Sequence, residues 1–140
     1  MDQEVVFHLF GLAAMGKRLV SLYESRFNMA TLRNLKIKTA TCKRILKELH
    51  SYEKEVEKEA AKTADMKEKG ADPYDLKQQE NVLAESRMMV PDCCKRLEAA
   101  RADLKGTLAG LKESNQQGIE IEEADGIITE VEALFPTEED

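Results

Sequence analysis

Apolar side chains recur at alternating intervals of three and four residues between about Thr31 and Lys69. The row consists of Cys42, Ile45, Leu49, Tyr52, Val56, Glu59, Thr63 and Met66. This spacing is typical of a helix that packs lengthwise on another helix. No glycine or proline interrupts the segment, although Glu59 and Thr63 weaken the row toward its end. We therefore predict one long helix here, with Thr31 as its N-cap.

A second and more regular row runs from about Pro73 to Leu111. A leucine or valine recurs every seven residues, at Leu76, Leu83, Val90, Leu97, Leu104 and Leu111. Small residues fill the positions between them, namely Ser86, Cys93, Ala100 and Thr107, so that a neighbouring helix can approach closely. Pro91 lies inside this segment, but the seven-residue spacing keeps its register through it. We therefore predict a second helix, of about 39 residues or roughly 58 Å, with a kink at Pro91 rather than a break.

A short turn joins the two predicted helices. In the sequence Gly70-Ala71-Asp72-Pro73, a glycine stands where one helix ends and a proline where the next begins. Asp72 can cap the second helix. Two helices of equal length joined by so short a turn form an antiparallel hairpin.

A shorter apolar row follows from about Glu120 to Phe135, and Pro136 ends it. The row consists of Ile121, Ala124, Ile128, Val131 and Phe135. Because this third helix starts where the second ends, it returns along the base of the hairpin and leaves the half near Gly70 less covered. The predicted fold is all-α: an antiparallel three-helix bundle of coiled-coil type, with two long helices and a shorter third.

Composition narrows the possible functions. The chain has 140 residues, of which 34% are charged and 5% aromatic, and a net charge of −6. An acidic chain is a poor candidate for binding nucleic acid, and no apolar run approaches the roughly 20 residues that span a bilayer. Three cysteines, two of them adjacent at Cys93 and Cys94, do not form a disulfide framework. We therefore expect a reducing compartment.

The sequence contains no arrangement typical of a catalytic, cofactor or metal site. Its two histidines, His8 and His50, have no partners at metal-ligand spacing. The sequence contains neither of the glycine-rich motifs that bind phosphate groups, G-x-x-x-x-G-K-[ST] and G-x-G-x-x-G. We expect no enzyme activity, no cofactor and no metal, and we interpret Cys93 as a packed small residue. Gly106 and Gly110 either allow close packing or loosen the end of the second helix.

Charge is distributed unevenly along the chain. Residues 29–47 contain six bases and no acids, whereas residues 113–140 contain ten acids and no bases. Two interpretations stay open. The two segments attract each other within the bundle, or the basic start of the first helix meets an acidic partner.

The segment Glu85–Cys93 carries the strongest candidate for a binding surface. In the heptad, Met88 faces away from the row of apolar residues and Met89 lies beside it. An exposed methionine pair beside a kink suits an uneven apolar partner. The alternative is that Met89 packs against the third helix and Met88 is an incidental surface residue.

This segment and four other stretches of the chain resemble the family of tubulin-folding cofactor A, also called tubulin-specific chaperone A. The similar stretches are Leu35–Thr39, Tyr52–Glu55, Tyr74–Gln79, Glu85–Cys93 and Arg96–Ala100. Together they place residues 29–140, about four fifths of the chain, within the resemblance. The resemblance implies a cytoplasmic, cytoskeleton-associated protein that captures β-tubulin after its release from the chaperonin, without nucleotide hydrolysis.

Partner-binding residues are expected on helix faces. The candidates are Arg87, Met88 and Met89, then Glu53 and Lys54, and more weakly Tyr74. The expected partner is a β-tubulin folding intermediate, with other tubulin-folding cofactors as further possible partners, no nucleic acid and no membrane. The chain is expected to be a monomer or a homodimer. The alternative function is a structural coiled-coil scaffold or self-association module, in which a second chain completes the weak row near Glu59 and Thr63.

Residues 1–28 lie outside the resemblance. They contain an apolar stretch followed by Lys17 and Arg18, with Asp2 and Glu4 before it. A secretory signal carries positive charge before its apolar region, and a mitochondrial presequence is poor in acids. We therefore expect an N-terminal extension to a bundle formed by residues 29–140. A membrane-surface role for Val5–Leu22 stays a further alternative.

Overall fold

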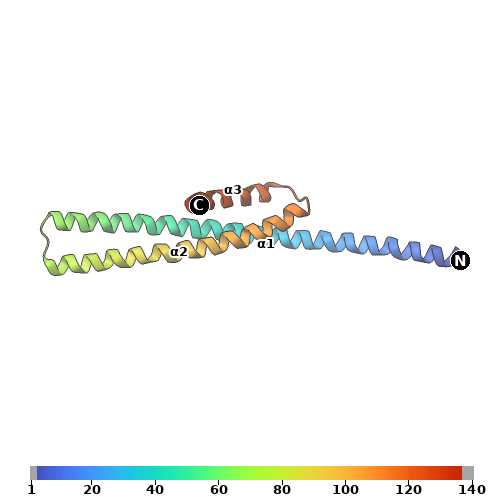
Figure 1. Cartoon of the computed structure of the whole chain (residues 1–140), viewed down its shortest axis with the longest axis horizontal. Coiled ribbons are helices and arrows are strands. Elements are labelled where there is room, and N and C mark those ends of the chain that lie inside the picture. The colour runs from blue at the N-terminus through green and yellow to red at the C-terminus, as the bar shows by residue number, and fades with distance from the viewer. Residues whose placement is uncertain (1–2, 137–140) are drawn as a thin grey trace.

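The computed structural model describes the backbone of residues 3–136 and the side chains of residues 16–136. Its three helices are α1 (Gln3–Glu68), α2 (Pro73–Glu113) and α3 (Ile119–Leu134), and the described range contains no strand. α1 and α2 form an antiparallel hairpin, and α3 folds back along both of them (Figure 1). The predicted all-α three-helix bundle is confirmed.

The start predicted for the first helix is wrong. α1 begins at Gln3, and Thr31 lies inside it, where its hydroxyl donates a hydrogen bond to the Phe27 carbonyl at 2.8 Å. A threonine inside a helix commonly bonds to the carbonyl four residues earlier, so a capping residue type alone does not start a helix. No proline precedes Thr31 to stop the helix. The first part of α1 therefore projects beyond the bundle (Figure 1).

α1 and α2 end with the same hydrogen-bonding pattern. Gly70 has a φ of 68°, its N–H donates to the Lys67 carbonyl at 3.2 Å, and the Ala71 N–H donates to the Met66 carbonyl at 3.0 Å. Asn115, with a φ of 56°, closes α2 in the same way. These are Schellman motifs, which satisfy the last carbonyls of a helix. Asp72 takes the N-cap position of α2, as predicted, but its side chain makes no capping hydrogen bond.

The core lies where the three helices meet. One cluster joins Leu35 and Cys42 of α1 to Leu104 and Leu108 of α2 and to Ile128 of α3. A second cluster, nearer the turn at Gly70, consists of Ile45, Leu46, Leu49, Cys93, Leu97 and Val131. α3 ends at the level of this second cluster, so the remaining half of the hairpin is made of two helices only (Figure 1). The predicted uneven cover of the hairpin is confirmed.

The hairpin itself completes the weak part of its apolar row. Glu59 is buried, and Gln79 of α2 donates a hydrogen bond from its Nε2 to Glu59 Oε2 at 2.6 Å. This hydrogen bond stabilises the ionised carboxylate and lowers the pKa of Glu59. Thr63 donates to the Glu59 carbonyl at 2.8 Å. The polar layer is therefore satisfied within one chain, and a second chain is not needed to fill it.

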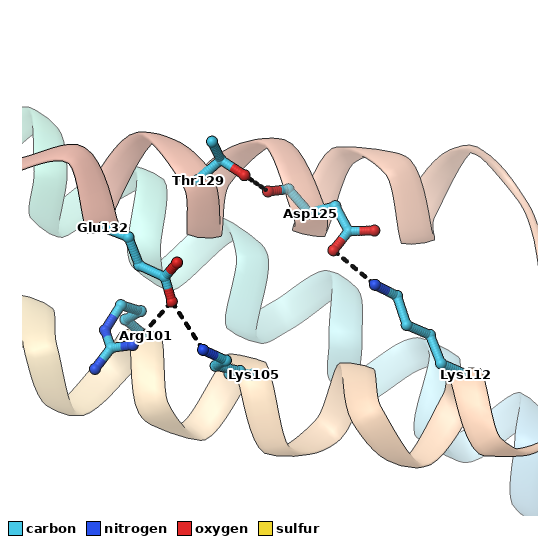
Figure 2. Close-up of polar contacts among 6 residues, drawn as sticks. All are labelled: Arg101, Lys105, Lys112, Asp125, Thr129 and Glu132. Carbon is cyan, nitrogen blue, oxygen red and sulfur yellow. Dashed lines mark hydrogen bonds and ion pairs between the residues drawn. The ribbon is translucent and has the colours of Figure 1, made fainter.

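Ion pairs fasten α3 to the other two helices. Lys36 and Lys43 of α1 pair with Glu120 and Glu123. From α2, Arg101 and Lys105 both contact Glu132, at 3.1 and 3.0 Å, and Lys112 contacts Asp125 at 2.9 Å (Figure 2). The hydrogen bond from Lys105, together with the neighbouring positive charges, lowers the pKa of Glu132. Part of the basic segment is therefore attracted to the acidic segment within the bundle, as one of the two interpretations predicted.

Gly106 and Gly110 are not required for close packing. Both are exposed within α2, and a Cβ at either position would meet nothing within 4 Å. Alanine is favoured over glycine inside a helix by about 1 kcal/mol. We expect the double variant Gly106→Ala/Gly110→Ala to raise the free energy of unfolding by about 1–2 kcal/mol, measured by urea denaturation. An unchanged or lower value would contradict a regular end of α2.

Candidate partner-binding surface

The structure places the candidate residues on the surface of the hairpin, close to its two-helix half. Met88 is 72% exposed, Met89 44% and Tyr74 68%. Arg87, Glu53 and Lys54 are also exposed. The alternative interpretation, in which Met89 packs against the third helix, is wrong. α3 stops at Leu134, and nearly half of the Met89 surface is exposed.

The candidates do not share one face. Arg87 lies seven residues before Cys94 and fourteen before Arg101, which pairs with Glu132 of α3. Since residues seven apart lie on the same side of a packed helix, Arg87 belongs to the edge of α2 that faces α3. Glu53 belongs to the matching edge of α1, because its charge acts on Cys94 and its carboxylate pairs with His50 at 3.5 Å.

Met89 lies on the opposite edge of α2. Arg96, seven residues further along, pairs with Glu48 of α1, and Asp103, after another seven, pairs with Lys38 at 3.0 Å. Met88 points outward between the two edges. A single flat partner cannot contact Arg87, Met88 and Met89 equally, because consecutive helix positions differ by about 100°.

One continuous surface does unite three of the candidates. The outward face of α2 from the turn to Pro91 consists of Tyr74, Gln78, Asn81, Val82, Glu85, Met88 and Met89, all exposed, and we call it the α2 stripe. Positions 74, 78, 82, 85 and 89 follow one another at intervals of three and four, which keeps them on one side of the helix. The stripe carries one charged side chain, Glu85, and no base.

The sequence interpretation missed Val82, which is 43% exposed. It lies one heptad before Met89 on the same edge of α2, so the seven-residue spacing contained the signal. Lys54 lies on α1, apart from the α2 stripe. The structure therefore places Tyr74, Met88 and Met89 on one exposed surface, and Arg87, Glu53 and Lys54 lie outside it.

The two adjacent cysteines occupy different environments. Cys93 is 1% exposed and its thiol lies 3.7 Å from the Ile45 carbonyl, so the interpretation as a packed small residue is confirmed. Cys94 is half-buried and packs against the cluster that contains Cys93 and Leu97. Burial raises the pKa of the Cys94 thiol, and nearby Cys93 and Glu53 act in the same direction. Cys94 therefore stays a neutral thiol with low reactivity.

Two kinds of site are not found in the described part of the chain. It holds no cluster of three or more histidine, cysteine or carboxylate side chains placed to bind a metal ion. None of its helices has a stretch apolar enough, over sufficient length, to cross a membrane.

The fold defines the class of protein: an all-α helical hairpin with a third helix packed along one end and the α2 stripe exposed toward the other. Residues 30–128 match the profile of the family described as tubulin binding cofactor A. The chain belongs to this family of tubulin-folding cofactors. The match includes all of α2 and the part of α1 that contributes to the core.

Individual relatives agree with this assignment. The chain is 74% identical over 112 residues to a tubulin-folding cofactor A from Arabidopsis thaliana, covering 79% of this chain and 99% of the relative. The crystal structure of tubulin folding cofactor A from Arabidopsis thaliana superposes with a TM-score of 0.73 at 75% identity, covering 75% of this chain and 98% of that one. A structure described as a β-tubulin binding post-chaperonin cofactor superposes with a TM-score of 0.64 at 30% identity, covering 74% and 99%.

Proposed function

We propose that this protein captures β-tubulin folding intermediates and keeps them competent for assembly into the αβ-tubulin heterodimer. Membership of the tubulin binding cofactor A family supports this, as does the likeness to a β-tubulin binding post-chaperonin cofactor. The observation that carries the proposal is the α2 stripe. It offers exposed apolar and amide side chains on a helix that α3 leaves uncovered at this level.

The proposed mechanism is equilibrium capture on a rigid face. The hairpin keeps its conformation because its own side chains satisfy its core and its Glu59 layer. Methionine side chains adapt to uneven apolar surfaces, which suits a partner that has not finished folding. Binding covers tubulin surface that α-tubulin covers later, and release needs no nucleotide and no catalysis.

The proposal assigns the tubulin contact to residues 29–140 and treats residues 1–28 as an N-terminal extension. Tyr74, Met88 and Met89 make the central contacts on the α2 stripe, and the partner reaches Arg87, Glu53 and Lys54 only where it extends beyond that stripe. The protein acts in the cytoplasm, close to the cytoskeleton, as a monomer or homodimer, and other tubulin-folding cofactors are further partners.

Suppression of β-tubulin aggregation tests this function. Unfolded β-tubulin diluted from denaturant is expected to scatter less light when an equimolar amount of the full chain is present, with no nucleotide added. A helical protein of another family at the same concentration serves as the control. Equal scattering with both proteins would overturn the proposal.

A further inference from the structure

The outer face of α1 carries a row of bases that the α2 stripe does not involve. The row consists of Arg26, Arg33, Arg44, Lys47, Lys54 and Lys58, all exposed, and we call it the basic stripe. On a helix with 3.6 residues per turn, these positions fall within a sector of about 80° and extend over about 48 Å. No Asp or Glu occupies that sector between residues 26 and 58.

Internal contacts do not account for the basic stripe. Within the described residues, none of its six side chains forms an ion pair. Lys36 falls in the same sector, but it pairs with Glu120 of α3 and is therefore not counted in the row. Lys54 and Lys58 lie four residues apart, where like charges repel each other along a helix. Apart from the favourable charge of Lys58 beside Glu59, the described contacts give these bases no partner within the fold.

A groove beside the stripe adds an apolar element. It has a volume of about 610 Å³ and lies between α1 and α3. The lining residues are Lys43, Arg44, Leu46, Lys47, His50, Ile127 and Glu130. Leu46 and Ile127 form the apolar part, and the rim on α1 is basic. Glu130 provides the single acid of the lining, on the α3 side.

We propose that the basic stripe and this groove form a docking site for an acidic polypeptide segment that carries apolar side chains among its carboxylates. The carboxylates pair with Arg44 and Lys47, and an apolar side chain enters the groove above Leu46 and Ile127. Lys54 and Arg33 extend the contact toward either end of the stripe. Charge complementarity selects the partner, and the groove selects for an apolar side chain within it.

Other polyanions fit this surface less well. A nucleic acid could pair its phosphates with the bases, but its backbone carries no apolar side chain to fill the part of the groove formed by Leu46 and Ile127. A membrane surface calls for apolar side chains that insert beside the bases. The sector holds the exposed Met29 near one end of the stripe, but beside the groove, between residues 40 and 58, it offers only Ala40 and Ser51 besides the bases.

A peptide-binding measurement tests the site. The probe is a fluorescently labelled peptide in which two central leucines are flanked on each side by four glutamates, followed by anisotropy with the full chain at about 0.1 M salt. We expect saturable binding that weakens as salt is added. The double variant Arg44→Glu/Lys47→Glu is expected to bind about tenfold more weakly, since two partly exposed ion pairs become repulsions.

The control reverses the same amount of charge elsewhere. Lys77 and Lys95 are exposed on α2 and form no ion pair among the described residues, so Lys77→Glu/Lys95→Glu changes the net charge equally. We expect its affinity to stay within about threefold, because charges beyond about 10 Å are largely screened at this salt concentration. Equal losses in both double variants would overturn the proposal, since they would show an effect of net charge alone.

Three further arms complete the test. The neutral variant Arg44→Gln/Lys47→Gln, checked for helicity by circular dichroism, is expected to weaken binding as well. A peptide with serines in place of the leucines is expected to bind several-fold more weakly, and equal affinity would remove the groove from the site. Tighter binding to polyuridine or to anionic phosphatidylserine vesicles than to the peptide would overturn the choice of partner. None of these arms contains tubulin, so they test the basic stripe separately from the proposed function.

Discussion

A Leu104→Ala variant is expected to lose about 2–5 kcal/mol of the free energy of unfolding. Leu104 is fully buried in the cluster where α1, α2 and α3 meet, beside Leu35, Cys42 and Ile128. Replacing its isobutyl group by a methyl group leaves a cavity that is lined by side chains of all three helices. Such a loss is a large part of the total stability of a domain of this size.

Urea denaturation followed by circular dichroism at 222 nm measures this effect. Leu22→Ala is the matched control, because Leu22 is 62% exposed on the projecting part of α1. Its free energy of unfolding should stay within about 0.5 kcal/mol of the unchanged chain. Similar values for both variants would show that the three helices do not share one core at Leu104.

Met88→Asp is expected to weaken the capture of free β-tubulin by about tenfold or more while helicity stays unchanged. Met88 is 72% exposed and forms part of no buried cluster, so the fold does not depend on it. A carboxylate in the middle of an apolar contact must be desolvated without a partner, which costs several kcal/mol when burial is complete. Affinity for β-tubulin, measured by titration on native gels, reports the loss.

Two variants make the Met88 result specific. Ala61→Asp places the same charge on an exposed position of α1, away from the α2 stripe, and should leave capture unchanged. Met88→Leu keeps the apolar volume and should retain most of the affinity. Equal capture by Met88→Asp and the unchanged chain would remove Met88 from the contact surface.

Periodicity predicted most of this fold because the information is local. The seven-residue row of α2 and the three-four row of α3 bury most of the residues expected, including Leu97, Leu104 and Val131, whereas Leu76, Val90 and Phe135 are half-buried. Gly70 indicates the turn because its backbone adopts a left-handed conformation, which glycine reaches without the steric cost that a Cβ imposes. The start of α1 was not predicted, because helix continuation depends on the absence of any breaker rather than on a capping residue such as Thr31.

The surface was harder to predict than the core. Exposure of Met88 and Met89 follows from their heptad positions, but whether Met89 is covered depends on where α3 ends, which is a tertiary property. The sequence alone shows Glu59 as a charged residue that interrupts the apolar row. The structure shows that Gln79, twenty residues further along the chain, lies opposite Glu59 and donates a hydrogen bond to its carboxylate. The basic stripe could not be predicted from the sequence, because only the structure shows that Lys36 and Lys43 form ion pairs within the bundle whereas the bases of the stripe do not.

The central claim is that this chain captures free β-tubulin. The most direct measurement mixes the full chain with β-tubulin released from denaturant, and separately with the native αβ dimer, and resolves the products on a native gel. Capture predicts a discrete complex with free β-tubulin, little or none with the dimer, and no dependence on added nucleotide. A folded helical chain that forms no complex with either would contradict the claim.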